Sequence, residues 1–149
     1  MDFDLSIWIE QPPEVVFALL RDKDLHPREA SSPVLALDKT TPGPVQVGTR
    51  YREVVQMLPF YQGEILSEIT RFEPVACIEE VFHGAGMAGV LVYEFVPEDG
   101  GTRLVQRESL HYGGLLRLLE PAIKLFLGRR LKGRLEEIKA YLEGANSER

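Results

Sequence analysis

The chain has 149 residues, of which 44% are hydrophobic and 27% are charged. This length fits one domain that buries roughly 70% of the surface of its extended chain, and the composition is that of an ordinary globular protein, not of a disordered one. The 17 basic and 23 acidic residues leave a net charge of −6, which disfavours nucleic acid or any other partner with many phosphates.

The amino-terminal sequence and the cysteine content predict a cytoplasmic protein. The segment "MDFDLSIWIE" carries acidic residues where a signal peptide needs basic ones. No stretch approaches the roughly 18 continuous apolar residues of a membrane span, so we expect no integral membrane association. The single cysteine, Cys77, cannot form an internal disulfide, and stability therefore does not depend on an oxidising compartment.

A strand followed by a short helix is predicted at the amino terminus. Residues 3–9 alternate between apolar and polar side chains, which is the period of a half-buried strand. Pro12 and Pro13 end this strand, and a proline suits the first helical position because its missing N–H would be unpaired there. The apolar segment "VVFALL" leaves the helix little polar surface, so we expect it to cap one end of a sheet. Residues 24–33, "DLHPREASSP", predict a second short helical turn and a loop.

Extended segments dominate the middle of the chain. The segments "TRYREVVQM", "GEILSEIT", "VLVYEFVP" and "TRLVQRESLHY" alternate in polarity, whereas the phase of residues 75–83, "VACIEEVFH", is ambiguous. The segment "PEDGGT" predicts a hairpin, because Asp-Gly and Gly-Gly supply the positive φ values that tight turns need. Together these segments predict an antiparallel sheet of about seven strands.

The final 35 or so residues change period. Their apolar residues recur at a spacing of three or four, which is the signature of one long amphipathic helix. Leu119, Ile123 and Phe126 are predicted to face the sheet. No other element is large enough to cover one face of the sheet, so the sequence predicts an α+β domain in which a curved sheet grips its last helix.

Five stretches of the sequence resemble the SRPBCC superfamily, which includes START-like, Bet v 1-like and polyketide cyclase/dehydrase-like proteins: "PPEVVFALLRD", "PGPVQVGTRY", "FEPVACIEE", "YEFVPEDGGTRL" and "GGLLRLLEPAIKLFLGRRLKGRLEEIKAYLE". The resemblance implies a helix-grip fold, with two short helices after the first strand and a deep apolar cavity between the sheet and the last helix. It covers nearly the whole chain. We therefore expect a single ligand-binding domain at residues 1–144 and a flexible tail at residues 145–149.

The inward phases of the strands and of the last helix predict the wall of this cavity. A mainly apolar wall with a few polar groups is typical of a small-molecule site, and we expect a volume of roughly 300–1,000 Å³. The residues predicted to contact a ligand are Tyr51, Glu53, Val55, Ile65, Leu91, Tyr93, Phe95, Gln106, Glu108, Leu110, Ile123 and Phe126.

Three of these residues, Glu53, Gln106 and Glu108, are polar. A buried carboxylate is unfavourable unless it is paired, so its pKa should rise or it should find a hydrogen-bond donor. Such a group could anchor the polar end of a ligand, or it could act as a general acid or base, which makes Glu53 and Glu108 the candidate catalytic residues. Alternatively, each carboxylate pairs with an arginine or a tyrosine at the cavity mouth.

The sequence predicts no metal site and no cofactor. No two of His26, His83, His111 and Cys77 stand three or four residues apart, as two metal ligands on one helix would. The glycine-rich segment "HGAGMAG" lacks the spacing and the Lys-Ser/Thr of a nucleotide-binding loop. The basic segment at residues 124–134 has two interpretations. It is either a solvated outer helix face or a contact for an anionic ligand group, a membrane surface or a partner.

Three functions are compatible with these patterns. The first is the binding or transport of a hydrophobic small molecule, such as a lipid, polyketide, isoprenoid or quinone-like compound. The second is an enzyme of the polyketide cyclase/dehydrase type in which Glu53 or Glu108 moves a proton. The third is a protein-interaction domain in which the cavity is vestigial.

Overall fold

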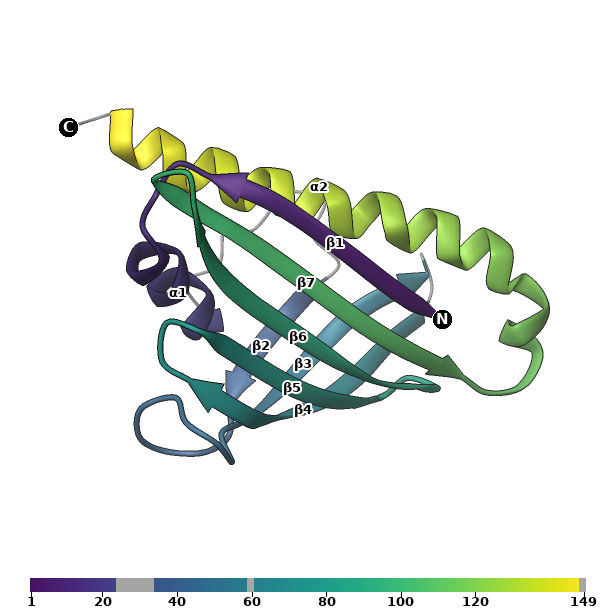
Figure 1. Ribbon diagram of the computed structural model, residues 1–149. Helices are drawn as coiled ribbons and strands as arrows, with labels where there is room; N and C mark the ends of the chain where they lie inside the picture. Colours follow the sequence, from purple (N-terminus) through teal and green to yellow (C-terminus); the bar gives the residue numbers. More distant parts are fainter. Residues whose placement is uncertain (24–33, 59–60, 148–149) are drawn as a thin grey trace.

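A computed structural model describes residues 1–23, 34–58 and 61–147 of the chain (Figure 1). Strand β1 (Asp2–Ile9) comes first, and helix α1 (Pro13–Arg21) follows it. The other strands are β2 (Val34–Lys39), β3 (Arg50–Leu58), β4 (Tyr61–Glu73), β5 (Cys77–Gly84), β6 (Met87–Glu98) and β7 (Gly101–Tyr112). The last elements are the 3₁₀ helix η2 (Gly114–Leu119) and helix α2 (Glu120–Ser147). The second short helix predicted after β1 falls at residues 24–33, outside the described residues.

All seven strands form one antiparallel sheet in the order β1-β7-β6-β5-β4-β3-β2. Strand β1 pairs with β7, with Phe3 opposite Glu108, so the first and the last strand of the chain are neighbours. In the turn between β6 and β7, Asp99 and Gly100 have φ values of 48° and 77°, as the Asp-Gly sequence predicted. The predicted seven-stranded antiparallel sheet is confirmed.

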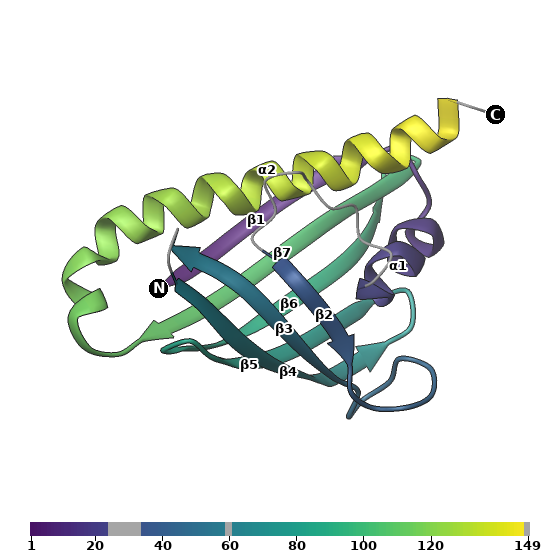
Figure 2. The same ribbon diagram turned by 180° about the vertical axis from the view of Figure 1, so that it is seen from behind.

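The sheet curves around helix α2, which runs along its concave side (Figures 1 and 2). Both views place α1 at one end of the sheet and η2 at the other. Val16, Phe17 and Leu20 of α1 are buried. The Phe17 ring lies 5.5 Å from the Phe72 ring and 5.3 Å from the Phe95 ring, measured between centroids. Helix α1 therefore caps one end of the sheet, as its apolar composition predicted.

The convex face of the sheet is polar. Across β3 and β4, Arg50 pairs with Glu68 at 2.8 Å and Arg52 pairs with Glu64 at 2.6 Å. Each of these four side chains is more than one third exposed, so solvent screens the pairs and each contributes little to stability. With its convex face solvated, the sheet buries apolar side chains on its concave face, toward α2.

Helix α2 packs on the sheet mainly through its second half. Ile138 and Leu142 are buried, with exposed fractions of 1% and 5%. In contrast, Phe126 is 64% exposed and Leu119 is 58% exposed, so the prediction that these two residues face the sheet is wrong. Ile123, the third residue of that prediction, is half-buried.

The inner side of α2 was predicted wrongly because the first half of this helix is apolar on two sides. Leu127 and Leu131 line the inner side of the helix, whereas Leu125 and Phe126 lie on the exposed side. A spacing of three or four residues can therefore be drawn through either side, and the two choices differ by one residue. Helix α2 also continues to Ser147, into the segment predicted as a flexible tail.

Candidate ligand-binding cavity

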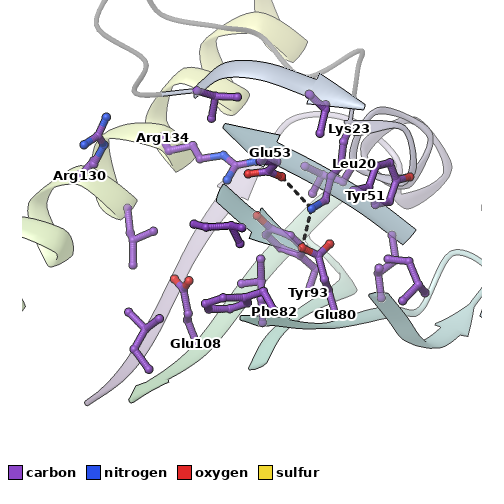
Figure 3. Close-up of a pocket in the computed structure, with 18 of the residues that line it drawn as sticks. Leu20, Lys23, Tyr51, Glu53, Glu80, Phe82, Tyr93, Glu108, Arg130 and Arg134 are labelled. Carbon is purple, nitrogen blue, oxygen red and sulfur yellow. Dashed lines mark hydrogen bonds and ion pairs between the residues drawn. The ribbon is translucent and has the colours of Figure 1, made fainter. Parts of the chain in front are cut away.

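A cavity of about 330 Å³ lies between the concave face of the sheet and helix α2 (Figure 3). Its apolar wall comes from several elements, including Ile65 of β4, Leu91 of β6, Leu110 of β7 and Leu131 of α2, and Leu20 contributes from α1. The volume lies near the lower end of the range for small-molecule sites. The space thus lies between the two layers that the helix-grip fold brings together.

Seven of the twelve residues predicted to contact a ligand lie on the cavity wall: Tyr51, Glu53, Ile65, Leu91, Tyr93, Glu108 and Leu110. The other five do not line it. Val55, Phe95 and Gln106 are buried elsewhere, Ile123 is half-buried and Phe126 is exposed. Phe95 shows the physical reason, because its ring packs against α1. An inward strand phase places a residue on the concave face of the sheet. Part of that face packs directly against the helices, so a residue there does not border the cavity.

An ion cluster occupies part of the cavity wall. Lys23, just beyond the end of α1, donates hydrogen bonds from Nζ to Glu53 Oε1 at 3.1 Å and to Glu80 Oε1 at 2.5 Å. Ser67 Oγ lies 3.5 Å from the same nitrogen, which also stands 4.8 Å from the centroid of the Tyr51 ring, within cation–π range. This cluster joins α1 to strands β3, β4 and β5 by charge as well as by packing.

The charge state of the cluster follows from its contacts. Burial lowers the pKa of Lys23, but the negative charges of Glu80 and Glu53 and the hydrogen bonds to them outweigh burial, so the pKa is raised above its usual value. The exposed fractions of the Lys23, Glu53 and Glu80 side chains are only 15%, 22% and 9%. Lys23 is therefore a cation at neutral pH, held in place by two carboxylates that solvent screens weakly.

A second polar group lies on β6 and β7. Tyr93 and Gln106 are direct partners across these strands, and Glu108 follows on β7. The Tyr93 hydroxyl and Glu108 Oε2 are buried and make no hydrogen bond within the described part of the chain. Because buried polar atoms are normally paired, these atoms are open to a partner that the chain does not supply, such as a ligand or water.

The Glu108 carboxyl holds its proton more tightly than an ordinary glutamate does. Burial raises the pKa of Glu108 to about 7, although the positive charge of Arg134 opposes this rise. Arg134 extends from α2 into the cavity (Figure 3). Burial also raises the pKa of Tyr93, so its hydroxyl stays neutral. Near neutral pH the cavity therefore contains one carboxyl group that can be either neutral or ionised.

Sequence reasoning did not select Lys23 or Glu80 as site residues. Lys23 follows α1 in a segment without apolar periodicity, and nothing in its surroundings indicates that it turns inward. Glu80 belongs to the strand whose phase was ambiguous. In the structure Glu80 lies opposite Leu91, and because paired residues share a face of the sheet, it points into the cavity.

Arg134 belongs to the basic segment 124–134, for which two interpretations were left open. Lys124 and Lys132 are exposed, whereas Arg130 and Arg134 line the cavity. The segment is therefore divided between the two sides of the helix. A signal was present in the sequence, since Arg134 follows Leu131 by three residues and shares its side of the helix.

The described residues form neither a metal-binding cluster nor a membrane-spanning helix. Within residues 1–23, 34–58 and 61–147, no three His, Cys, Asp or Glu side chains gather as a metal site would require. Among the helices that the structure describes, none is long and apolar enough to cross a membrane.

The fold and the cavity define a helix-grip protein with an internal pocket. The sequence model of the family described as "Polyketide cyclase / dehydrase and lipid transport" matches residues 1–143, so the chain belongs to this family. The resemblance to the SRPBCC superfamily is thereby confirmed. No curated protein matches the sequence.

Several solved structures share this fold at low sequence identity. Protein TTHA0849 from Thermus thermophilus is 19% identical with a TM-score of 0.73, over 97% of this chain and 99% of that chain. An uncharacterized protein from Rhizobium leguminosarum is 15% identical with a TM-score of 0.74, and the match covers 96% of this chain and 94% of that chain. Ara h 8.0201 is 14% identical with a TM-score of 0.70, and the match covers 97% of this chain and 98% of that chain. The family and the fold support a ligand-binding role in general.

Proposed function

We propose that this protein binds or transports a hydrophobic small molecule of the lipid, polyketide, isoprenoid or quinone-like class. The observation that carries this proposal is the cavity of about 330 Å³ between the sheet and α2, with its mainly apolar wall. Because the volume is near the lower end for small-molecule sites, it favours a compact ring system or a single chain over a lipid with two long chains.

Unpaired polar atoms on the wall favour a ligand that carries a hydroxyl or carbonyl oxygen. Tyr93 and Glu108 line the cavity, and each has a side-chain oxygen without a hydrogen-bond partner among the described residues. The tyrosine hydroxyl and a neutral carboxyl can both donate to such an oxygen. Lys23 is already engaged by Glu53 and Glu80, so the ion cluster has less to offer a ligand.

Replacing Leu91 with tryptophan should abolish the stabilisation of the protein by a ligand. Leu91 lines the cavity, and the larger indole would occupy the space that the ligand needs. A ligand present at a hundred times its Kd stabilises the wild-type fold by about 2.7 kcal/mol, which raises the Tm in a saturable way. Thermal unfolding with a panel of fatty acids, flavonoids, quinones and polyketide-like aromatics measures this shift.

Val90→Trp is the matched control, because Val90 precedes Leu91 on β6 and is 36% exposed on the other face of the sheet. This variant should keep the ligand-dependent rise in Tm. The proposal fails if Leu91→Trp responds to the ligand as the wild type does. It also fails if the wild type responds to no compound of the panel and native mass spectrometry finds no retained small molecule.

Glu108 favours a second candidate function, proton transfer of the cyclase/dehydrase type. The carboxyl lines the cavity, and burial raises its pKa to about 7, so acid and base forms are both present at neutral pH. The ionised form could take a proton from a carbon next to a carbonyl group, and the neutral form could return one to a leaving hydroxyl, which departs as water. Glu53 is less suited to this role because Lys23 holds it as an ion pair.

Under this second candidate function, Glu108→Gln should lower kcat for a verified substrate by about 100-fold or more, which is the usual contribution of a general acid or base. Ligand affinity should change little, because glutamine keeps the shape of the side chain. Separate measurements of kcat and Kd test this difference. Glu94→Gln on the convex face is the control, since Glu94 pairs with the exposed Arg107. Unchanged turnover in Glu108→Gln would end the catalytic assignment.

A further inference from the structure

Helix η2 and the first half of α2 carry an apolar and basic surface that the cavity does not use. Leu118, Leu119, Leu125 and Phe126 are exposed by 79%, 58%, 59% and 64%. The neighbouring Arg129 and Lys132 are also exposed. We call these six residues the α2 outer surface. Several large exposed apolar side chains within one short segment, next to charged ones, are typical of an interaction site.

The spacing of the four α2 residues in this set places them on one side of the helix, and Leu118 and Leu119 precede them at the end of η2. Leu125 and Phe126 precede Arg129 by four and three residues, and Arg129 precedes Lys132 by three, so the four side chains share a helix face. The opposite side carries the cavity-lining Leu131. The sheet covers only that inner side, and the apolar residues of the outer side are left in solvent.

The charge of this region is opposite to that of the rest of the protein. Residues 117–134 hold six of the 17 basic residues of the chain and only one of its 23 acidic residues, although the net charge of the chain is −6. A negatively charged surface would therefore attract this region and repel the remainder of the molecule, so the protein would approach with η2 and α2 in front.

We propose that the α2 outer surface docks this protein on an anionic lipid bilayer. The four apolar side chains enter the boundary between headgroups and acyl chains, while Arg129 and Lys132 contact the lipid phosphates. Apolar and basic side chains side by side on one helix are the pattern of helices that lie in a membrane interface. Each basic residue near the bilayer adds attraction to anionic lipids.

A second copy of the chain fits this surface less well. A two-fold symmetric contact through it would place Arg129 and Lys132 of both copies in one interface, because such an interface uses the same patch twice. None of the six residues of the α2 outer surface is acidic, so this surface offers no charge that would neutralise them. The charge of the surface is thus complementary to anionic headgroups and not to itself.

Docking in this way places the cavity beside the bilayer. Leu127 and Arg130 line the cavity, and each follows directly after a residue of the α2 outer surface, Phe126 or Arg129. A hydrophobic ligand could then pass between bilayer and cavity over a short path. This consequence rests on the proposed ligand-binding function, whereas the docking itself does not.

Co-sedimentation with vesicles tests the docking. The wild type should bind vesicles made of equal parts of phosphatidylcholine and phosphatidylglycerol, should bind pure phosphatidylcholine weakly, and should lose affinity for anionic vesicles as salt is raised. Arg129→Gln with Lys132→Gln should lower that affinity by about 30-fold, which corresponds to about 1 kcal/mol per basic residue. Leu125→Gln with Phe126→Gln should lower it by about tenfold or more. All four replaced side chains are exposed, so the variants should fold.

Two double variants on the sheet serve as matched controls. Leu66→Gln with Val96→Gln removes two apolar side chains that are 39% and 42% exposed, and Arg50→Gln with Arg71→Gln removes two exposed positive charges. The first pair controls for replacing exposed apolar side chains by glutamine, and the second matches the change in net charge. Both should bind anionic vesicles as the wild type does.

The proposal is overturned if the wild type does not bind anionic vesicles, or if the variants of the α2 outer surface bind as tightly as the controls. It is also overturned if light scattering shows a dimer that Leu125→Gln with Phe126→Gln loses, because a second copy would then cover the surface. Leu91→Trp separates docking from ligand binding. It should lose the ligand-dependent rise in Tm and keep its affinity for vesicles.

Discussion

Replacing Lys23 with methionine should lower the free energy of unfolding by about 3–5 kcal/mol, because the buried Glu80 and the half-buried Glu53 would lose their shared cation. Lys23 Nζ lies 3.1 Å from Glu53 and 2.5 Å from Glu80. The three side chains are 15%, 22% and 9% exposed, so water replaces the lost partner poorly. Methionine keeps most of the apolar stem of lysine, and a urea titration at neutral pH measures the loss.

Two further variants show whether the unpaired charge causes the loss. Adding Glu80→Gln to Lys23→Met removes one of the stranded carboxylates, so the double variant should be more stable than Lys23→Met alone. Arg50→Met removes the cation of an exposed pair with Glu68 and should cost less than about 1 kcal/mol. Equal losses for Lys23→Met and Arg50→Met would contradict a buried ion cluster.

The pH dependence of this contribution follows from the direction of the pKa shift. The pKa of Lys23 is raised above its usual value of 10.5 in the folded protein, by the negative charges of Glu80 and Glu53 acting against burial. A raised pKa stabilises the fold below the unfolded value and ceases to do so as the pH rises through the folded value. The contribution that Lys23 makes through its raised pKa should therefore be complete at neutral pH and be lost as the pH rises into strong alkali.

The strands and their order were predictable because local chemistry and periodicity agree in them. In β6, Leu91 and Tyr93 alternate with outward residues, and both line the cavity as their phase indicated. The turn between β6 and β7 contains Asp99 and Gly100, which adopt the positive φ values that their residue types favour. Where a strand has a clear period and a specific turn, its inward side can be determined from the sequence.

The candidate site was harder to predict because several of its residues depend on register or on loops. Strand β5 has polar and apolar residues in both phases, and a shift of one residue in its pairing would move Glu80 to the outer face. The structure pairs Glu80 with Leu91, which points it inward. Lys23 reaches the cavity from beyond the end of a helix, and that position follows from tertiary packing and not from local sequence.

For helix α2, the side that meets the sheet was difficult to predict from the sequence. A helix that is apolar on two sides offers two phases, and the sequence alone does not tell which side meets the sheet. The structure assigns Leu127 and Arg134 to the inner side and Phe126 to the outer side. Phe126, which was predicted to contact the ligand, thus belongs to the surface that we propose to bind a bilayer.

Glu108→Gln should make the protein more stable than the wild type above neutral pH. Burial raises the pKa of Glu108 from 4.5 to about 7 in the folded state, against the opposing charge of Arg134. The folded protein therefore holds this proton more tightly than the unfolded chain, and the wild type loses stability as the pH rises from 4.5 to about 7. A shift of this size corresponds to a loss on the order of 3 kcal/mol.

Urea titrations of both proteins across this pH range test the prediction. Glutamine cannot ionise, so the stability of Glu108→Gln relative to the wild type should increase between pH 4.5 and about 7 and then level off. Glu94→Gln on the convex face is the control for replacing a glutamate outside the cavity, because Glu94 pairs with the exposed Arg107. A constant difference between Glu108→Gln and the wild type would mean that Glu108 is ionised at the same pH in the folded and unfolded states. In that case the carboxyl would not be the neutral donor that we propose for the polar group of the ligand.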